Sequence, residues 1–212
     1  MSAPQSYYVP VDAGEAEFTE KRSHFLGHVR RVETEAEARA FLDEMRKKYY
    51  DARHNCWCYV LHEGGVVRYG DDGEPQGTAG QPMLNVFQRE GVENVVCVVT
   101  RYFGGVLLGA GGLTRAYAKS AKDALDAAGK ARMRLWSAVT VDCPYPMLER
   151  LKLLAATHGG TVEGTDFGAA VSVRILLPQE NAAGFDAALI ELSAGTMTAR
   201  REGERFLPGP RE

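Results

Sequence analysis

Three carboxylates stand close together in one short segment, where they could bind a cation or shape a loop. Asp71, Asp72 and Glu74 lie within residues 70–80, a stretch dominated by turn-forming residues and therefore expected to be a loop. Carboxylate oxygens are ligands that Mg²⁺ prefers. The segment does not follow the EF-hand pattern, which needs further ligands and a distal Glu. The sequence leaves a magnesium site and a solvated loop of Asx turns as alternatives.

A glycine-rich segment lies between an apolar run and a helical pattern. Residues 95–99 are β-branched and apolar, as in a buried strand, and a helical pattern begins near Gly112 or Leu113 and continues to about Ala128. Backbone N–H groups at a helix start can face an anion, and glycine allows close approach of the main chain. The glycines between the two elements are Gly104, Gly105, Gly109, Gly111 and Gly112.

These glycines match neither standard phosphate-binding motif. Gly104 and Gly109 have the first spacing of a P-loop, but Ala110 and Gly111 occupy the positions of its Lys and Ser/Thr. The dinucleotide fingerprint fails as well, because Thr114 stands at its last glycine position. Tight turning with close packing, contact with a phosphate or nucleic-acid backbone, and contact with a protein partner remain alternatives.

Arginine, tyrosine and histidine flank these two segments. Arg101 and Tyr102 precede Phe103 at the start of the glycine-rich segment, and aromatic side chains beside arginine can stack on nucleic-acid bases. His54 has Asp51 three residues before it, which is not by itself a catalytic spacing. We weigh a hydrogen-bonded structural role for this histidine against contact with a substrate or partner.

The elements that position these residues follow from hydrophobic periodicity and caps. The first half of the chain predicts a strand within 18–31, a helix over 34–49 with the capping box Thr34–Glu37, and strands at 56–61 and 66–69 around a turn at 62–65. A helix is expected to start at Pro82 and end at Gly91. We expect residues 1–16 to be loosely ordered at the start.

The second half predicts the order β-α-β-β-α-β of a ferredoxin-like split βαβ domain. Lys130, Arg132 and Arg134 indicate a basic linker before it. The domains expected are therefore 1–134 and 135–205, followed by a flexible tail at 206–212. The predicted elements are strands at 135–143, 161–165, 169–177 and 196–201, and helices at 144–157 and 180–192.

Composition sets limits on the class of protein. The chain has 212 residues, 45% of them hydrophobic and 25% charged, with a net charge of −3 that gives no general attraction to nucleic acid. No segment approaches 18 apolar residues and no apolar leader is present, so we expect a cytoplasmic protein with no membrane contact. The four cysteines have no zinc-site spacing, and we expect buried thiols at Cys56, Cys58, Cys97 and Cys143.

Three long motifs carry a resemblance to a known family. DARHNCWCYV at 51–60, DDGEPQGTAGQPML at 71–84 and RYFGGVLLGAGGLTRAYAKSAKDAL at 101–125 together resemble the IMPACT family, in particular its bacterial YigZ-type members with a second domain. The resemblance implies an α+β protein, with an N-terminal domain of the ribosomal protein S5 domain 2-like fold and a C-terminal ferredoxin-like βαββαβ domain. Eukaryotic relatives regulate translation by competing for the ribosome-associated activator of a kinase, and they also bind actin.

The resemblance also implies a shared binding surface, with no catalytic assignment. We predict a translation-linked regulatory binding protein that contacts RNA or a ribosome-associated partner, with no cofactor, metal or catalytic residue. The alternatives are a protein adaptor without nucleic acid and a Mg²⁺-dependent enzyme acting on a phosphorylated small molecule. The ligand- or partner-binding residues predicted are Arg53, His54, Asp71, Asp72, Glu74, Thr78, Arg101, Tyr102, Gly104, Gly105, Gly109, Gly111, Gly112 and Arg115.

Overall fold

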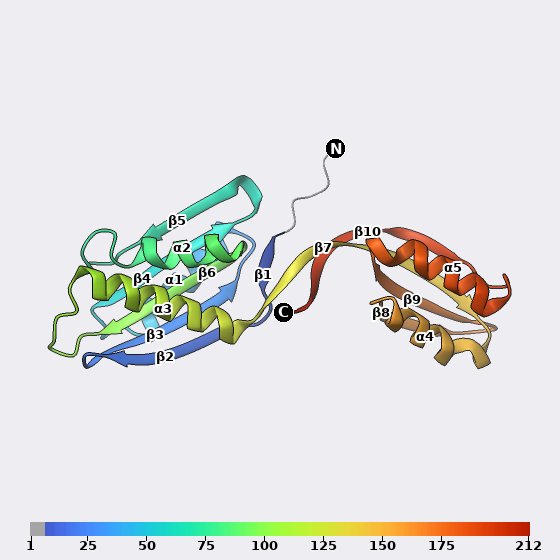
Figure 1. Ribbon diagram of the computed structural model, residues 1–212, viewed down its shortest axis with the longest axis horizontal. Helices are drawn as coiled ribbons and strands as arrows, with labels where there is room; N and C mark the ends of the chain where they lie inside the picture. The colour runs from blue at the N-terminus through green and yellow to red at the C-terminus, as the bar shows by residue number, and fades with distance from the viewer. Residues whose placement is uncertain (1–6) are drawn as a thin grey trace. The chain divides into compact units, whose positions relative to one another are not determined.

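The computed structural model describes residues 7–212, and the chain forms two compact units (Figure 1). The first unit runs to Arg132 and also contains Pro208–Glu212, whereas the second is Met133–Leu207. Helices combine with antiparallel strand pairs in each unit, so the predicted α+β class is confirmed. Two long strands, β7 (Lys130–Cys143) and β10 (Ala199–Arg211), contribute residues to both units.

The first unit is built on a five-stranded sheet in the order β2-β3-β6-β4-β5, in which every neighbouring pair is antiparallel. The apolar run that the sequence assigns to a buried strand is the start of β6, which lies at the centre and is buried along almost its whole length. The strands are β2 (Gly14–Glu20), β3 (Ser23–Arg31), β4 (His54–Leu61), β5 (Val66–Gly70) and β6 (Val95–Tyr102).

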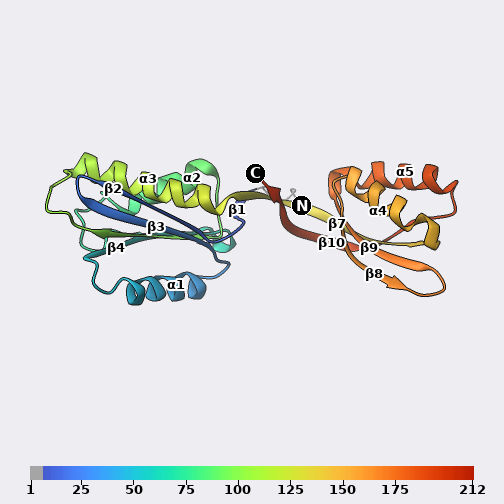
Figure 2. The ribbon, with the colours of Figure 1, turned by 90° about the horizontal axis from the view of Figure 1, so that it is seen from below.

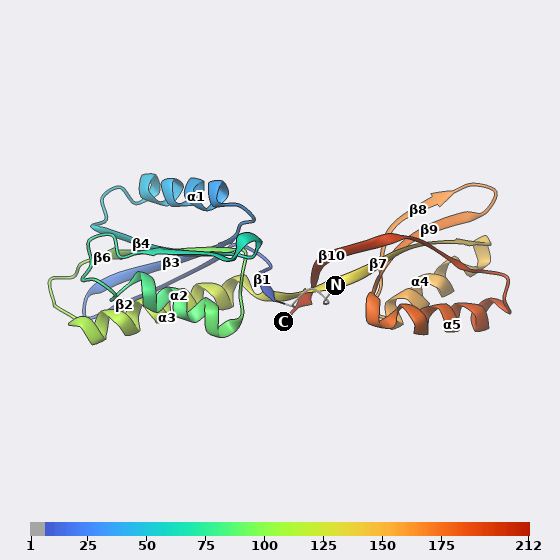
Figure 3. The same ribbon diagram turned by 90° about the horizontal axis from the view of Figure 1, so that it is seen from above.

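Helices cover both faces of this sheet. The helix α1 (Glu35–Lys48) lies on one face, while α2 (Gly80–Glu90) and α3 (Ala110–Ala128) lie side by side on the other (Figures 2 and 3). The predicted capping box starts α1: the Glu37 N–H donates to Thr34 Oγ1 at 3.2 Å, and the Glu37 carboxylate accepts from the Thr34 N–H. Each face therefore buries its own hydrophobic core.

The second unit confirms the predicted βαββαβ order, since its strands lie in the order β10-β7-β9-β8 of a ferredoxin-like sheet. Both helices cover the same face (Figure 2), and the core between helices and sheet includes Leu151, Ile175 and Phe185. The remaining elements of this unit are α4 (Leu148–Thr157), β8 (Thr161–Phe167), β9 (Val171–Pro178) and α5 (Ala182–Ser193), with short 3₁₀ turns at Tyr145–Met147 and Gln179–Asn181.

Two expectations, about the C-terminal end and about the linker, need correction. The segment expected to be a flexible tail, 206–212, continues β10 to Arg211, and the Glu212 N–H donates to the Lys130 carbonyl at 2.8 Å. Pro208 and Pro210 fit there because β10 is an edge strand, where a proline leaves no ladder partner unsatisfied. The expected basic linker is part of β7, which is held to α2 by a Lys130–Glu90 ion pair of 2.5 Å.

The expectation of loose order at 1–16 lies partly outside the described residues. From residue 7 onward the structure is regular, with β1 (Tyr8–Pro10) pairing with β7 and then β2 starting at Gly14. The strand expected within 18–31 is β3, and it forms a hairpin with β2. All four cysteines are buried and free, as predicted. Among the described residues, no helix is long and apolar enough to cross a membrane.

Candidate functional site

Two of the predicted acidic residues hold the loop at 70–80 in shape. The Asp71 carboxylate accepts the N–H groups of Gly77 at 2.8 Å, Ala79 at 3.1 Å and Gly80 at 2.8 Å, so it caps the start of α2. Asp72 Oδ2 accepts the Asn55 N–H at 2.7 Å, which ties the same loop to β4. Both oxygens of Asp71 and one oxygen of Asp72 therefore accept backbone donors.

Another predicted residue of this loop, Thr78, also holds the loop in shape. Its hydroxyl is buried and donates to the Pro75 carbonyl at 2.6 Å. Among residues 7–212 no group of three or more His, Cys, Asp or Glu side chains is placed to hold a metal ion. The loop is held by hydrogen bonds from Asp71 to backbone N–H groups six to nine residues along the chain and from Asp72 to Asn55 on β4, which are longer in range than the Asx turns expected from the sequence.

Glu74 differs from its neighbours because its side chain turns into the protein. Arg101 Nη1 donates to Glu74 Oε1 at 2.6 Å, and the Tyr117 hydroxyl donates to the same oxygen at 2.8 Å. Arg101 Nη2 donates to Ser23 Oγ at 3.2 Å, and the guanidinium lies 5.5 Å from the ring centre of Phe25. Burial raises the pKa of the Tyr117 phenol, which therefore stays a hydrogen-bond donor.

His54 stands beside this buried pair in a fixed orientation. Its Nδ1 lies 2.9 Å from the Asp72 carbonyl oxygen, and a carbonyl can only accept, so the neutral ring carries its proton on Nδ1. The other nitrogen, Nε2, is then an acceptor, and it lies 4.0 Å from Glu74 Oε1. Strand pairing explains the placement, because His54 on β4 is directly opposite Arg101 on β6.

The acidic loop and the glycine-rich segment meet around one cavity of about 320 Å³, which we call the loop cavity. The sequence left open whether these segments form one site. The start of α3 forms part of the wall: its N-cap residue is Gly109, with φ 72° and ψ 164°, which has no side chain to cap this end. The lining residues are Arg53, His54, Glu74, Pro75, Arg101, Phe103, Leu107, Leu108, Gly109, Ala110 and Leu113.

The five predicted glycines have three different roles. A Cβ on Gly104 would lie 2.0 Å from the Arg22 carbonyl atoms, and one on Gly112 would lie 2.9 Å from Leu108 Cβ, so both positions serve close packing. Gly105 and Gly109 have φ values of 82° and 72°, which favour glycine at open positions. Gly111 is helical, and its nearest neighbour, Arg115 Nη1, is at an ordinary 3.6 Å.

The close approach at Gly104 brings the tip of the β2–β3 hairpin to the end of the first unit that carries the loop cavity. Lys21 and Arg22 form this tip with φ values of 45° and 65°, a left-handed conformation that costs non-glycine residues about 1–3 kcal/mol each. Ser23 Oγ fixes the tip by accepting the Gly104 N–H at 3.3 Å as well as the Arg101 guanidinium. Both cationic side chains are exposed, and neither forms an ion pair with any described residue.

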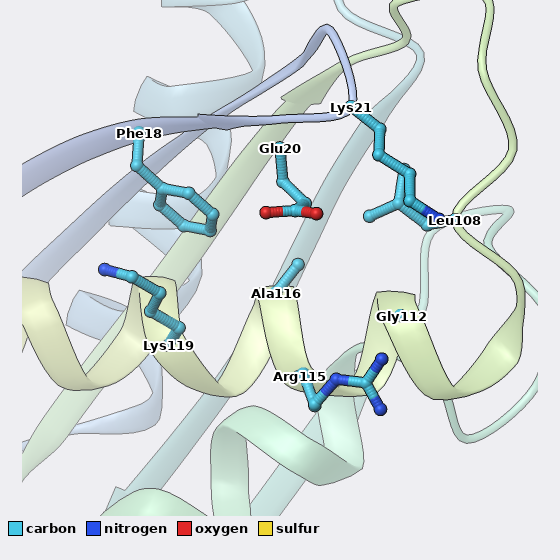
Figure 4. A pocket seen from close by; sticks show the side chains of 8 residues that line it. All are labelled: Phe18, Glu20, Lys21, Leu108, Gly112, Arg115, Ala116 and Lys119. Atoms are coloured by element: carbon cyan, nitrogen blue, oxygen red, sulfur yellow. The ribbon is translucent and has the colours of Figure 1, made fainter.

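A smaller hollow of about 160 Å³, which we call the α3 hollow, adjoins the loop cavity, since Leu108 lines both. Figure 4 shows Lys21 reaching toward Leu108 from the hairpin, and Arg115 and Lys119 on the helix opposite. The ammonium of Lys119 lies 4.6 Å from the ring centre of Phe18 and pairs with Asp123. Arg115 has no ion-pair partner among residues 7–212, so it remains an available cation.

Three other polar side chains, on α3 and β6, already have partners. Lys119 is paired with Asp123, and Lys122 is paired with Asp126 and Glu90. Tyr102 lines neither hollow, and its hydroxyl donates to Asp51 Oδ1 at 2.7 Å. That bond raises the pKa of Tyr102 to about 12.

Sequence reasoning missed several residues of this end, including Lys21, Arg22 and Leu107. An adjacent Lys–Arg pair between two alternating strand patterns is the signal that would have located the hairpin tip. Of the residues predicted from the sequence, Arg53, His54, Glu74, Arg101 and Gly109 line the loop cavity, and Gly112 and Arg115 line the α3 hollow.

Comparison with known proteins agrees with this two-part architecture. Residues 21–125 match the Impact N-terminal domain, and residues 141–196 match a domain of unknown function (DUF1949). The chain is 34% identical to IMPACT family member YigZ of Escherichia coli over 84% of this chain and 88% of that protein. It is 41% identical to IMPACT family member YvyE of Bacillus subtilis over 69% of this chain and 68% of that protein.

A eukaryotic relative and a solved structure extend the comparison. Protein IMPACT of Rattus norvegicus is 32% identical over 51% of this chain and 35% of its own length. A solved structure described as "Crystal structure of an hypothetical protein" shares 32% identity and a TM-score of 0.58, covering 92% of this chain and 96% of its own. On the family models and the extent of these matches, the chain belongs to the IMPACT family.

Proposed function

We propose that this protein is a translation-linked regulatory binding protein that contacts RNA through the end of its first unit. The observation that carries the proposal is a group of cations that have no ion-pair partner among residues 7–212 and come from three separate segments at one end of the first unit. Lys21 and Arg22 come from the hairpin tip, Arg53 precedes β4, and Arg115 lies on α3. We call these four side chains the tip cations. Such cations are free to neutralise phosphates.

Two further observations support a nucleic-acid ligand over the alternatives. Phe103, exposed by 41%, lines the loop cavity together with Arg53 and offers a ring for stacking. The alternative of a Mg²⁺-dependent enzyme receives less support, because both Asp71 oxygens and Asp72 Oδ2 already accept backbone N–H groups. The translation link rests on the family, whose eukaryotic members regulate translation. In this proposal the N-terminal domain, residues 1–134, makes the contact.

The test compares two variants that lose the same amount of positive charge. The first replaces all four tip cations with Gln, and the second replaces Lys47, Arg68, Arg89 and Arg150, which are exposed cations elsewhere on the chain. Binding to single-stranded RNA and co-sedimentation with ribosomes are measured at about 50 mM and about 200 mM salt. Single-strand binding loses about 0.7 of a log unit per phosphate contact for each log unit of salt, so the wild-type slope should approach −3.

We expect the tip variant to bind weakly with a nearly flat salt dependence, and the matched control to behave as the wild type. Wild-type protein that binds neither RNA nor ribosomes at the lower salt would overturn the proposal. Ribosome association that survives both high salt and ribonuclease would instead favour a protein partner, which is the adaptor reading.

A further inference from the structure

The loop cavity has an apolar side that a flat or apolar group can cover. Pro75, Phe103, Leu107, Leu108 and Leu113 line it, from the acidic loop, the glycine-rich segment and α3. Leu107 is 81% exposed, so the wall is open to a ligand at the surface. A volume of about 320 Å³ falls at the lower end of the range typical of small-molecule sites.

The same cavity has an end suited to an anion, on two independent observations. The first is the uncapped N-terminus of α3, a helix of 19 residues, whose first N–H groups have no intrahelical acceptor. The second is Arg101, whose side chain is 6% exposed and lines the cavity, and whose Nε has no hydrogen-bond partner among the described residues. Arg53, exposed and without an ion-pair partner, completes the positive edge.

The third feature is an acceptor inside the cavity. His54 is held by its Nδ1 contact with the Asp72 carbonyl, so Nε2 of the neutral ring presents a lone pair. Glu74 lies next to it as a carboxylate that already accepts from Arg101 and Tyr117. A ligand that brings a hydroxyl or a ring N–H to this point would satisfy the histidine.

We propose that the loop cavity binds a single nucleotide. Its phosphate occupies the α3 N-terminus beside Arg53, its base covers the apolar side with Leu107 and Phe103, and a base N–H or ribose hydroxyl donates to His54. A nucleotide combines an anion, a flat apolar face and hydrogen-bond donors, which are the three features of this cavity. The inference rests on the proposed function, because it assigns one nucleotide of the bound RNA, or a free mononucleotide of the same chemistry, to this site.

Binding of mononucleotides to the full chain tests the cavity. AMP, GMP, CMP and UMP are titrated by calorimetry, with the nucleosides and inorganic phosphate in parallel. We expect at least one mononucleotide to bind about tenfold more tightly than its nucleoside and than phosphate, since each of these lacks one half of the contact. Leu107→Asp and Arg53→Gln should each weaken binding about tenfold or more.

Matched controls come from neighbouring positions outside the cavity. Val106, 39% exposed, is adjacent to Leu107 but does not line the cavity, and Arg89 is an exposed cation at the end of α2. Val106→Asp and Arg89→Gln should bind as the wild type. Failure of all four mononucleotides to bind at millimolar concentration, or binding by Leu107→Asp equal to that of Val106→Asp, would overturn the inference.

Competition with RNA identifies the source of the nucleotide and separates this inference from the proposed function. A mononucleotide that displaces labelled RNA indicates that the cavity holds a nucleotide of the strand, and one that binds without displacement indicates a free ligand; either result supports a nucleotide site. RNA binding that persists with no mononucleotide binding would overturn the cavity inference alone. Absence of RNA binding by the wild-type protein would overturn the proposed function, whatever the result with mononucleotides.

Discussion

Arg101 Nη1 lies 2.6 Å from Glu74 Oε1, and the two side chains are 6% and 4% exposed. This buried ion pair joins β6 to the acidic loop, and the Tyr117 hydroxyl connects the same oxygen to α3. The Glu74 carboxylate therefore links the three segments that form the loop cavity: the acidic loop, β6 and α3. Because two charges are withdrawn from water, neither partner can be removed without leaving the other uncompensated.

Replacing Arg101 with Met should destabilise the protein strongly. The Glu74 carboxylate would remain buried without its cation, which typically costs about 3–5 kcal/mol of unfolding free energy. Urea unfolding monitored by circular dichroism gives this free energy from the transition midpoint and slope. For the same reason, Arg101→Ala is a poor test of RNA binding, whereas the exposed tip cations can be changed without this loss.

The matched double variant Arg101→Met with Glu74→Gln should recover part of the loss. A neutral amide can keep the Tyr117 bond and has no buried charge, so the double variant is expected to be more stable than Arg101→Met alone. Equal stability of the single and double variants would contradict the assignment of the cost to the unpaired carboxylate.

Alanine at three glycines should have three different effects on stability. Gly104→Ala should destabilise by overpacking, about 1–3 kcal/mol, because its Cβ would lie 2.0 Å from the Arg22 backbone. Gly105→Ala should lose about 1 kcal/mol from its φ of 82° alone, since nothing lies within 4 Å. Gly111→Ala should be neutral or stabilising by up to about 1 kcal/mol, because it is helical and unobstructed.

The three glycine variants are measured together by thermal and urea unfolding, and Gly111→Ala serves as the internal control for the method. A loss of stability at Gly111 as large as that at Gly104 would contradict the distinction between the closely packed Gly104 and the unobstructed Gly111. An unchanged Gly104→Ala would show that the hairpin tip moves freely away from the glycine-rich segment.

Much of the fold could be predicted from local patterns. The capping box at Thr34 and the apolar run that opens β6 each follow from short-range chemistry, and both predictions were correct. The ferredoxin-like order was likewise visible, because helical and strand periodicities alternate clearly in the second half. The end of β10 was missed since two prolines normally indicate a loop, and an edge position is decided by tertiary pairing.

The site was harder to predict from the sequence, because its residues are joined by contacts between distant segments. Asp71, Asp72 and Glu74 look alike in the sequence, yet the first two accept backbone N–H groups and the third is buried against Arg101. The hairpin tip at Lys21 lies far along the chain from Gly104, and the packing that brings them together has no local signature. Long-range packing of this kind cannot be derived from spacing.

His28 should make stability depend on pH. Burial lowers its pKa below the usual 6.5, partly opposed by Glu15, whose Oε1 is 3.3 Å from Nδ1, while Lys48 and Arg30 lower the pKa further. Between the folded and unfolded pKa values the unfolded chain binds more protons, so the unfolding free energy rises with pH. The contribution linked to His28 is fully present above about pH 6.5 and is lost as the pH falls toward the lower pKa of the folded state.

Urea unfolding between pH 5 and pH 8 measures this dependence, for which one extra bound proton gives a slope of up to about 1.4 kcal/mol per pH unit. His28→Leu has similar volume and cannot titrate, so its slope near pH 6 should be smaller than that of the wild type. His24→Leu, at a half-buried position on the same strand, is the matched control and should keep the wild-type slope. Identical slopes for all three proteins would contradict the inference that burial of His28 makes stability depend on pH.

Asp51 should control the ionisation of Tyr102. Its carboxylate accepts the Tyr102 hydroxyl at 2.7 Å, and this hydrogen bond is the largest cause of a pKa raised to about 12. Asp51→Asn removes the negative charge that disfavours the phenolate, so the pKa of Tyr102 should fall toward its ordinary value near 10. Carbon-13 NMR of labelled tyrosine rings, with Tyr102→Phe to assign the signal, follows the titration. The control is Asp43→Asn, which removes an exposed carboxylate on α1 and should leave the pKa of Tyr102 near 12. An unchanged Tyr102 titration in Asp51→Asn would show that burial, and not the hydrogen bond, raises this pKa.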